Sequence, residues 1–107
     1  MNSYAWDTAI VFIQTFSGDP DYSQQRSLQT SLTTTGNAHD SNNNYDVRCN
    51  IYDMAGNVRE FSTETCTSSI YPRVNRGGNY SNSYSCPATR DYYNSGTGVG
   101  FRSTLYL

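Results

Sequence analysis

Two carboxylates flank a tight turn near the middle of the chain. Asp53 stands directly before the turn Met54-Ala55-Gly56-Asn57, and Glu60 lies just beyond it. Carboxylates and freed backbone carbonyls in a short loop are the oxygen ligands that a hard cation such as calcium prefers. The alternative is a turn whose two acids are solvated or paired with arginine. The spacing alone favours this alternative.

Thiols and imidazole, the other groups that could do chemistry, are few. The three cysteines, Cys49, Cys66 and Cys86, cannot all pair within one chain, and their spacing matches no zinc pattern. This usage is typical of small buried thiols in a reducing compartment, whereas a Cys49–Cys66 or Cys66–Cys86 bridge stays open if the protein is exported. The single histidine, His39, has no partner at ligand spacing, so we expect it to be solvent-exposed.

The last third of the chain is rich in side chains that bind rather than react. Between two strand-like segments, 72–78 and 99–107, almost every residue is Asn, Ser, Tyr, Asp, Thr or Gly. Tyr offers broad and fairly rigid contact area, and Ser, Asn and Gly adapt their hydrogen bonds, as in antibody paratopes. The alternative is a polar surface loop without a partner. The predicted ligand-binding residues form two runs: Asn79, Ser81, Asn82, Ser83, Tyr84 and Ser85, followed by Asp91, Tyr92, Tyr93, Asn94, Ser95 and Thr97.

Length and charge limit the classes of protein and partner. A chain of 107 residues predicts one compact domain over 1–107. The net charge of −2 and the lack of a Lys/Arg cluster argue against nucleic acid or an anionic membrane as partner. The first residues show no signal peptide, and no stretch is long enough to span a bilayer. These features leave the oligomeric state and the cellular location open.

The first 20 residues predict one amphipathic helix over 3–16. Ser3 is the expected N-cap, and the sequence Ser17-Gly18-Asp19-Pro20 is expected to end the helix. The residues expected to face the core recur at three- and four-residue steps: Trp6, Ala9, Ile10, Ile13 and Phe16.

The rest of the chain predicts short strands separated by polar loops. A strand is expected over 47–52, a turn over 53–57 and a second extended run over 58–61. Polar loops are expected over 37–44 and 62–69. Together with one helix, this pattern favours an α+β fold. The inner face of the 47–52 strand is expected to carry Val47, Cys49 and Ile51.

Three sequence blocks, in order, resemble the formylglycine-generating-enzyme-like (sulfatase-modifying factor) family. Residues 50–61 are similar to its "YDMxGNVWEW" block, residues 73–78 to "RVxRGG", and residues 100–102 to the closing "GFR". The helix with Trp6 and Ala9 resembles the family's "W.DA..F" helix. The resemblance implies a C-type-lectin-like fold. The family's larger domains carry strands ahead of that helix, so the chain would be a minimal version or a piece completed by another chain.

The resemblance implies a calcium site but no catalysis. The family's catalytic cysteines follow the Gly77-Gly78 pair, and here residues 79–85 contain no thiol, while Cys86 is similar to a structural cysteine. Copper- and thiol-dependent oxidation is therefore not expected, and one histidine cannot supply the set that iron-dependent relatives need. The family's Trp is replaced by Arg59. The implied calcium ligands are the side chains of Asp53 and Glu60 and the carbonyls of Gly56 and Val58.

Variable proteins of diversity-generating retroelements share this fold, and the residue types of their C-terminal segment are similar to those of this chain. Their C-terminal segment is rewritten at adenines, which yields the residue types that fill the segment from about 79 to 97. The resemblance implies a bacterial or phage display protein that binds a protein or cell-surface ligand and requires no cofactor. Two other interpretations stay open: a relative of the oxidases that has lost its catalytic cysteines, and a structural piece of a larger assembly.

Overall fold

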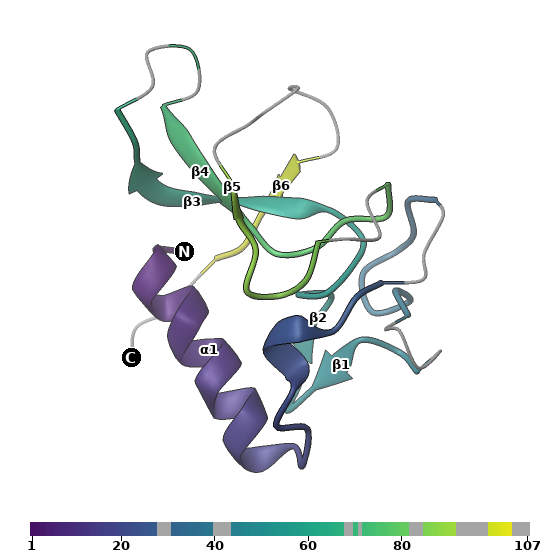
Figure 1. Ribbon diagram of the computed structural model, residues 1–107. Helices are drawn as coiled ribbons and strands as arrows, with labels where there is room; N and C mark the ends of the chain where they lie inside the picture. The colour runs from purple at the N-terminus through teal and green to yellow at the C-terminus, as the bar shows by residue number, and fades with distance from the viewer. Residues whose placement is uncertain are drawn as a thin grey trace.

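One helix lies beside a mixed four-strand sheet and a small two-strand sheet (Figure 1). The predicted α+β class is therefore confirmed. The computed structural model describes residues 1–27, 31–39, 44–67, 70, 72–81, 85–91 and 99–103. The elements in chain order are α1 (Ser3–Phe16), the 3-10 helix η1 (Tyr22–Gln24), β1 (Val47–Arg48), β2 (Ile51–Tyr52), β3 (Arg59–Thr65), β4 (Arg73–Arg76), β5 (Arg90–Asp91) and β6 (Val99–Phe101).

Helix α1 covers the residues that the periodicity predicts, but its cap differs. The side chain of Asn2, and not that of Ser3, accepts a hydrogen bond from the Ala5 N–H at 2.7 Å, so Asn2 is the N-cap. The Ser3 hydroxyl instead donates to Glu64 on β3. At the other end the helix stops as expected, with Ser17 as C-cap and Gly18 at a φ of +74°.

The buried face of α1 is narrower than the sequence predicts. Trp6, Ile10 and Ile13 are buried, and Ala9 is partly buried against them. Phe16 was expected in the core, and this is wrong because its side chain is exposed. At 3.6 residues per turn, position 16 lies about 120° around the helix from Ile10, which is outside the buried stripe.

The hydrophobic core joins the helix to the segment between the two sheets. Trp6, Ile10 and Ile13 pack with Tyr22 of η1 and with Met54, which follows β2. The indole N–H of Trp6 donates to the carbonyl of Pro87 at 2.8 Å, so this buried donor is satisfied. Figure 1 shows α1 with its first turn beside the four-strand sheet and η1 between its last turns and the two-strand sheet.

The four-strand sheet has the order β5-β4-β3-β6. β4 pairs antiparallel with both β3 and β5, whereas β6 pairs parallel with β3. The expected strand at 72–78 is confirmed as β4. The expected strand at 99–107 is confirmed only over β6, since Arg102 and Ser103 lie beyond the end of the strand, and residues 104–107 lie outside the described residues.

One expected loop is a strand. β3 continues to Thr65, whereas the sequence predicts a polar loop from residue 62. Ser62 is buried in this strand, and its hydroxyl donates to the Val74 carbonyl at 2.9 Å. The carbonyl on the neighbouring strand β4 provides a hydrogen-bond partner for the Ser62 hydroxyl. A polar residue can therefore be buried in β3, although the polar sequence after residue 61 predicted a loop.

The expected single strand at 47–52 is a hairpin. β1 and β2 pair antiparallel, and the two residues between them, Cys49 and Asn50, have φ values of +53° and +61°. A two-residue loop with both residues left-handed matches the twist of the flanking strands. Cys49 therefore lies exposed in the turn and not on one face with Val47 and Ile51.

The three cysteines are free thiols. Cys49 is exposed, and Cys66 and Cys86 are half-buried, so the expectation of buried thiols is wrong and neither predicted bridge forms. His39 is half-buried and not exposed, because its ring stacks on Tyr45 at a centroid distance of 4.7 Å. An isolated β-bridge also joins His39, within the expected loop at 37–44, to Tyr45 just beyond it.

Candidate functional site

Four of the twelve predicted ligand-binding residues lie in the part of the chain that the structure describes. Ser81 is exposed, Asn79 and Asp91 are half-buried, and Ser85 is buried with 4% of its surface exposed. The expectation that Ser85 is displayed is therefore wrong. The other eight lie outside the described residues: Asn82, Ser83, Tyr84, Tyr92, Tyr93, Asn94, Ser95 and Thr97.

Arg59 brings together the end of the first run and the start of the second. One terminal nitrogen of its guanidinium donates to Asp91 Oδ2 at 2.8 Å, and the other donates to Ser85 Oγ at 2.8 Å. The arginine side chain is only 13% exposed, so these contacts are largely shielded from water. Ser85 and Asp91 therefore anchor the two runs to β3.

The backbone of Arg59 also reaches the far end of the second run. Arg59 is the register partner of Val99 in the parallel β3–β6 pair, and Asp91 is the register partner of Asn75 in the β4–β5 pair. The residues on both sides of the segment 92–98 are thus fixed to the same sheet. Sequence reasoning did not assign Arg59 to the site, although an arginine where the resembled sequence block has Trp was the available signal.

The start of the first run is packed against the turn that follows Asp53. The Gly78 N–H donates to the Met54 carbonyl at 3.0 Å, and the Tyr80 N–H donates to the Asn57 carbonyl at 2.9 Å. A Cβ at Gly78 would lie 1.9 Å from the Ala55 carbonyl oxygen, which no side chain can tolerate. Gly78 therefore permits the close backbone approach that sequence reasoning expects of the glycine pair.

The two predicted acids lie in one pocket of about 250 Å³ but in different settings. Asp53 is buried, and its Oδ2 accepts from the Gly36 N–H at 2.8 Å and from Asn57 Nδ2 at 3.5 Å. Its Oδ1 is buried without a hydrogen-bond partner. Glu60 is also buried, but Arg102 donates to both of its oxygens, at 2.8 and 3.2 Å. The pocket is lined by Thr35, Asp53, Asn57, Val58, Glu60, Gly100, Phe101 and Arg102.

Buried charge dominates the electrostatics around this pocket. Burial raises the pKa of the Glu60 carboxyl, and the Arg102 guanidinium opposes that rise. Burial also raises the pKa of Asp46, although it accepts hydrogen bonds from the Tyr22 hydroxyl at 2.7 Å and from the Ala55 N–H at 2.6 Å. Asp46 was not singled out from the sequence, and Arg102 was expected only as the last residue of the "GFR" block, because the partners of both residues lie far away along the chain.

The implied calcium ligands do not fit calcium as they stand. The unpartnered Asp53 Oδ1 is the kind of atom that a cation would attract, and Val58 lines the same pocket beside the buried Gly56. The guanidinium of Arg102, however, occupies both oxygens of Glu60, where a cation would have to bind. Within the described ranges, no three His, Cys, Asp or Glu residues form a group suited to a metal ion.

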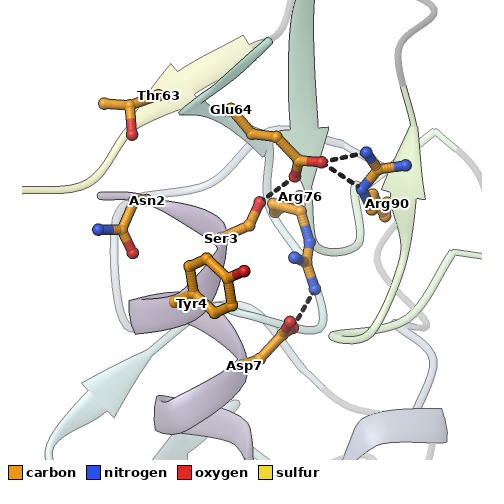
Figure 2. Close-up of a pocket in the computed structure, with 8 residues that line it drawn as sticks. All are labelled: Asn2, Ser3, Tyr4, Asp7, Thr63, Glu64, Arg76 and Arg90. Atoms are coloured by element: carbon orange, nitrogen blue, oxygen red, sulfur yellow. Dashed lines mark hydrogen bonds and ion pairs between the residues drawn. The ribbon is translucent and has the colours of Figure 1, made fainter. Parts of the chain in front are cut away.

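A larger pocket of about 400 Å³ lies at the start of α1, and sequence reasoning did not predict it (Figure 2). Its charges are paired across the pocket: Arg76 with Asp7, and Arg90 with Glu64. Figure 2 shows that the Ser3 hydroxyl also donates a hydrogen bond to Glu64. A charged ligand would have to break one of these pairs to bind. The lining residues are Asn2, Ser3, Tyr4, Asp7, Thr63, Glu64, Arg76 and Arg90.

Comparison with family models, with curated proteins and with solved structures finds no match for this chain. The case for a function therefore rests on the residues and contacts above. Among the described residues, no helix has the length and hydrophobicity needed to cross a membrane.

Proposed function

We propose that this chain is a non-enzymatic binding module of C-type-lectin-like fold, a display protein of the diversity-generating-retroelement type. Its binding surface would be the variable-like segment from about 79 to 97, without the buried Ser85 and with Asp91 as an anchor. The partner would be a protein or a ligand on a cell surface, bound by tyrosine contacts and adaptable Ser and Asn hydrogen bonds. No cofactor is required for this function.

The observation that carries the proposal is the set of contacts made by Arg59. Arg59 binds Ser85 and Asp91 through its side chain and pairs with Val99 through its backbone. In a display protein, the residues on either side of each variable stretch must keep their positions while the residues within the stretch change. Loops held at their ends by a rigid scaffold are how many proteins carry variable binding residues.

The genomic DNA around the gene gives the most direct test of this proposal. A display protein of this type predicts a second, nearly identical copy of the segment that encodes residues 74–107. The copies should differ only where the second copy has adenines, above all at the codons of the two runs. Absence of such a copy and of a nearby reverse transcriptase gene would remove the main rationale for the binding surface.

Calcium binding at the Asp53 turn is the second candidate, and the unpartnered Asp53 Oδ1 is the observation that favours it. The side chains of Asp53 and Glu60 would bind the ion together with the carbonyls of Gly56 and Val58. Because Arg102 occupies Glu60, calcium would first have to displace the guanidinium. We therefore expect calcium binding only when Arg102 is replaced, and a calcium titration of both forms tests this.

A further inference from the structure

The solvent-facing side of α1 carries four large hydrophobic or aromatic side chains, with Asp7, Thr8 and Thr15 between them. Tyr4, Val11, Phe12 and Phe16 are 87%, 61%, 43% and 69% exposed. The rings of Phe12 and Phe16 contact each other at a centroid distance of 4.9 Å, so they present one continuous surface. Large exposed apolar patches on soluble proteins usually mark an interaction site.

The polar groups on this side of the helix are already satisfied within the chain. The hydroxyl of Thr8 donates to the Tyr4 carbonyl at 2.7 Å, and that of Thr15 donates to the Val11 carbonyl at 2.7 Å. The single charged residue of α1 is Asp7, which is paired with Arg76. Burial of this face would therefore leave the two threonine hydroxyls and Asp7 with their partners, so the usual cost of burying such groups is reduced here.

We infer that the outer face of α1 is the interface of a homodimer, in which the helix packs antiparallel against α1 of a second copy. Apart from Asp7, which is paired with Arg76, this face carries no charge that could complement a charged partner or repel its own copy. Twofold dimers with the same patch on both subunits are the commonest assemblies, and an antiparallel pair aligns the helix dipoles favourably. A lipid surface fits less well, because α1 contains no Lys or Arg to accompany its apolar face.

The size of the face predicts a weak dimer. Aromatic side chains bury on the order of 150–250 Å² each, so the four exposed side chains offer roughly 500 Å² per copy. The total of roughly 1,000 Å² lies at the lower end of specific interfaces, where complexes are transient. We therefore expect the dimer fraction to rise between about 10 μM and about 1 mM, because a dissociation constant of about 1 mM corresponds to weak association.

Sedimentation of the full chain under reducing conditions tests the dimer. The wild-type mass should rise toward two chains over this concentration range. Val11→Glu should stay monomeric throughout, because it places like charges near the twofold axis. Ile70→Glu is the matched control, since Ile70 is 75% exposed but lies outside α1, and it should associate like the wild type. A wild-type chain that stays monomeric at the highest concentration would overturn the inference.

A mixing experiment separates loss of the interface from loss of folding. Chains carrying Val11→Glu or Val11→Lys should each be monomeric alone, and an equimolar mixture should form dimers again. Failure of the mixture to associate, with both variants folded, would contradict the antiparallel pairing. Wild-type monomers that co-sediment with anionic phospholipid vesicles would instead identify the face as a membrane contact and refute the dimer.

Discussion

Arg59 and Arg102 lie at opposite ends of the parallel β3–β6 pair, and each binds an acid, but they have different partners. Arg102 follows β6 and binds Glu60, a buried carboxylate inside the frame of the fold. Arg59 begins β3 and binds Asp91, the first residue of the second predicted binding run. Arg102 thus compensates a buried charge, whereas Arg59 positions the flanks of a surface. Arg102 is therefore important for the stability of the fold, whereas Arg59 is important for the proposed function.

Replacing Arg102 with Met should have the largest effect on stability. The change leaves Glu60 buried without its partner, and breaking such a pair typically costs about 3–5 kcal/mol. Urea unfolding of the variant measures the loss in free energy. Arg102→Lys keeps the charge but not the two-pronged hydrogen bond, so it should lose less. Unchanged stability of the Met variant would mean that Glu60 needs no compensating charge.

The loss in the Arg102→Met protein should also depend on pH. Burial raises the pKa of Glu60 in the folded state above its ordinary value of 4.5, and the variant lacks the arginine that opposes this rise. The folded state then binds the Glu60 proton more tightly than the unfolded state, so the contribution of Glu60 to stability is fully present below pH 4.5 and is lost as the pH rises through its raised pKa. Unfolding at pH 4.5 and pH 8 should therefore show a smaller loss at the lower pH. Equal losses would contradict the role of the Glu60 charge.

Arg59→Met should cost less, because Asp91 is partly solvated. A partly exposed pair of this kind contributes about 1 kcal/mol. A double-mutant cycle with Asp91→Asn isolates the pair, and we expect a coupling free energy of about that size. Arg59→Met with Ser85→Ala tests the second contact in the same way. Additive effects in both cycles would show that Arg59 does not hold the two flanks.

Replacing Tyr92 and Tyr93 together with Ser should leave stability nearly unchanged, within about 0.5 kcal/mol, as is usual for surface substitutions. The same protein should lose binding to a partner selected for the wild-type chain from a displayed protein library, because central tyrosines often dominate binding. Urea unfolding and a titration with that partner give both readouts. Unfolding of the double variant would count against a display surface at these positions.

Calcium should have the smallest effect on the wild-type protein. With Arg102 on Glu60, the melting temperature should be the same in calcium as in a chelator. In Arg102→Ala the two acids lose their internal cation, so calcium should raise the melting temperature of that variant, because a ligand that binds only the folded state stabilises it. A clear rise in the wild-type protein would show that Arg102 is displaced and would restore the full calcium site.

The sequence predicted the regular elements whose side-chain pattern is periodic. The helix at 3–16 followed from apolar spacing, β4 was expected as a strand-like segment before the glycine pair, and the close approach at Gly78 followed from that pair. The hairpin at Cys49 and Asn50 was missed, because neither residue is a glycine and both adopt a left-handed conformation.

The partners of buried polar groups could not be predicted, because they lie far apart in the sequence. Arg102 is 42 residues from Glu60, and Arg59 is 32 residues from Asp91. Ser85 is also 26 residues from Arg59, which explains why it was expected on the surface. The composition of the two runs predicted where a binding surface would lie. Only the structure shows that Ser85 and Asp91 within these runs are anchors held by Arg59.

A mutational scan of the whole chain, read out by resistance to a protease, tests the central claim most directly. The account predicts that Arg59, Gly78, Ser85 and Asp91 tolerate few substitutions, because they hold the flanks of the two runs. The residues between those flanks, 82–84 and 92–98, should accept most substitutions without loss of protease resistance. If these segments prove as intolerant as Arg59 and Gly78, they are part of the frame, and the account of a display surface is wrong.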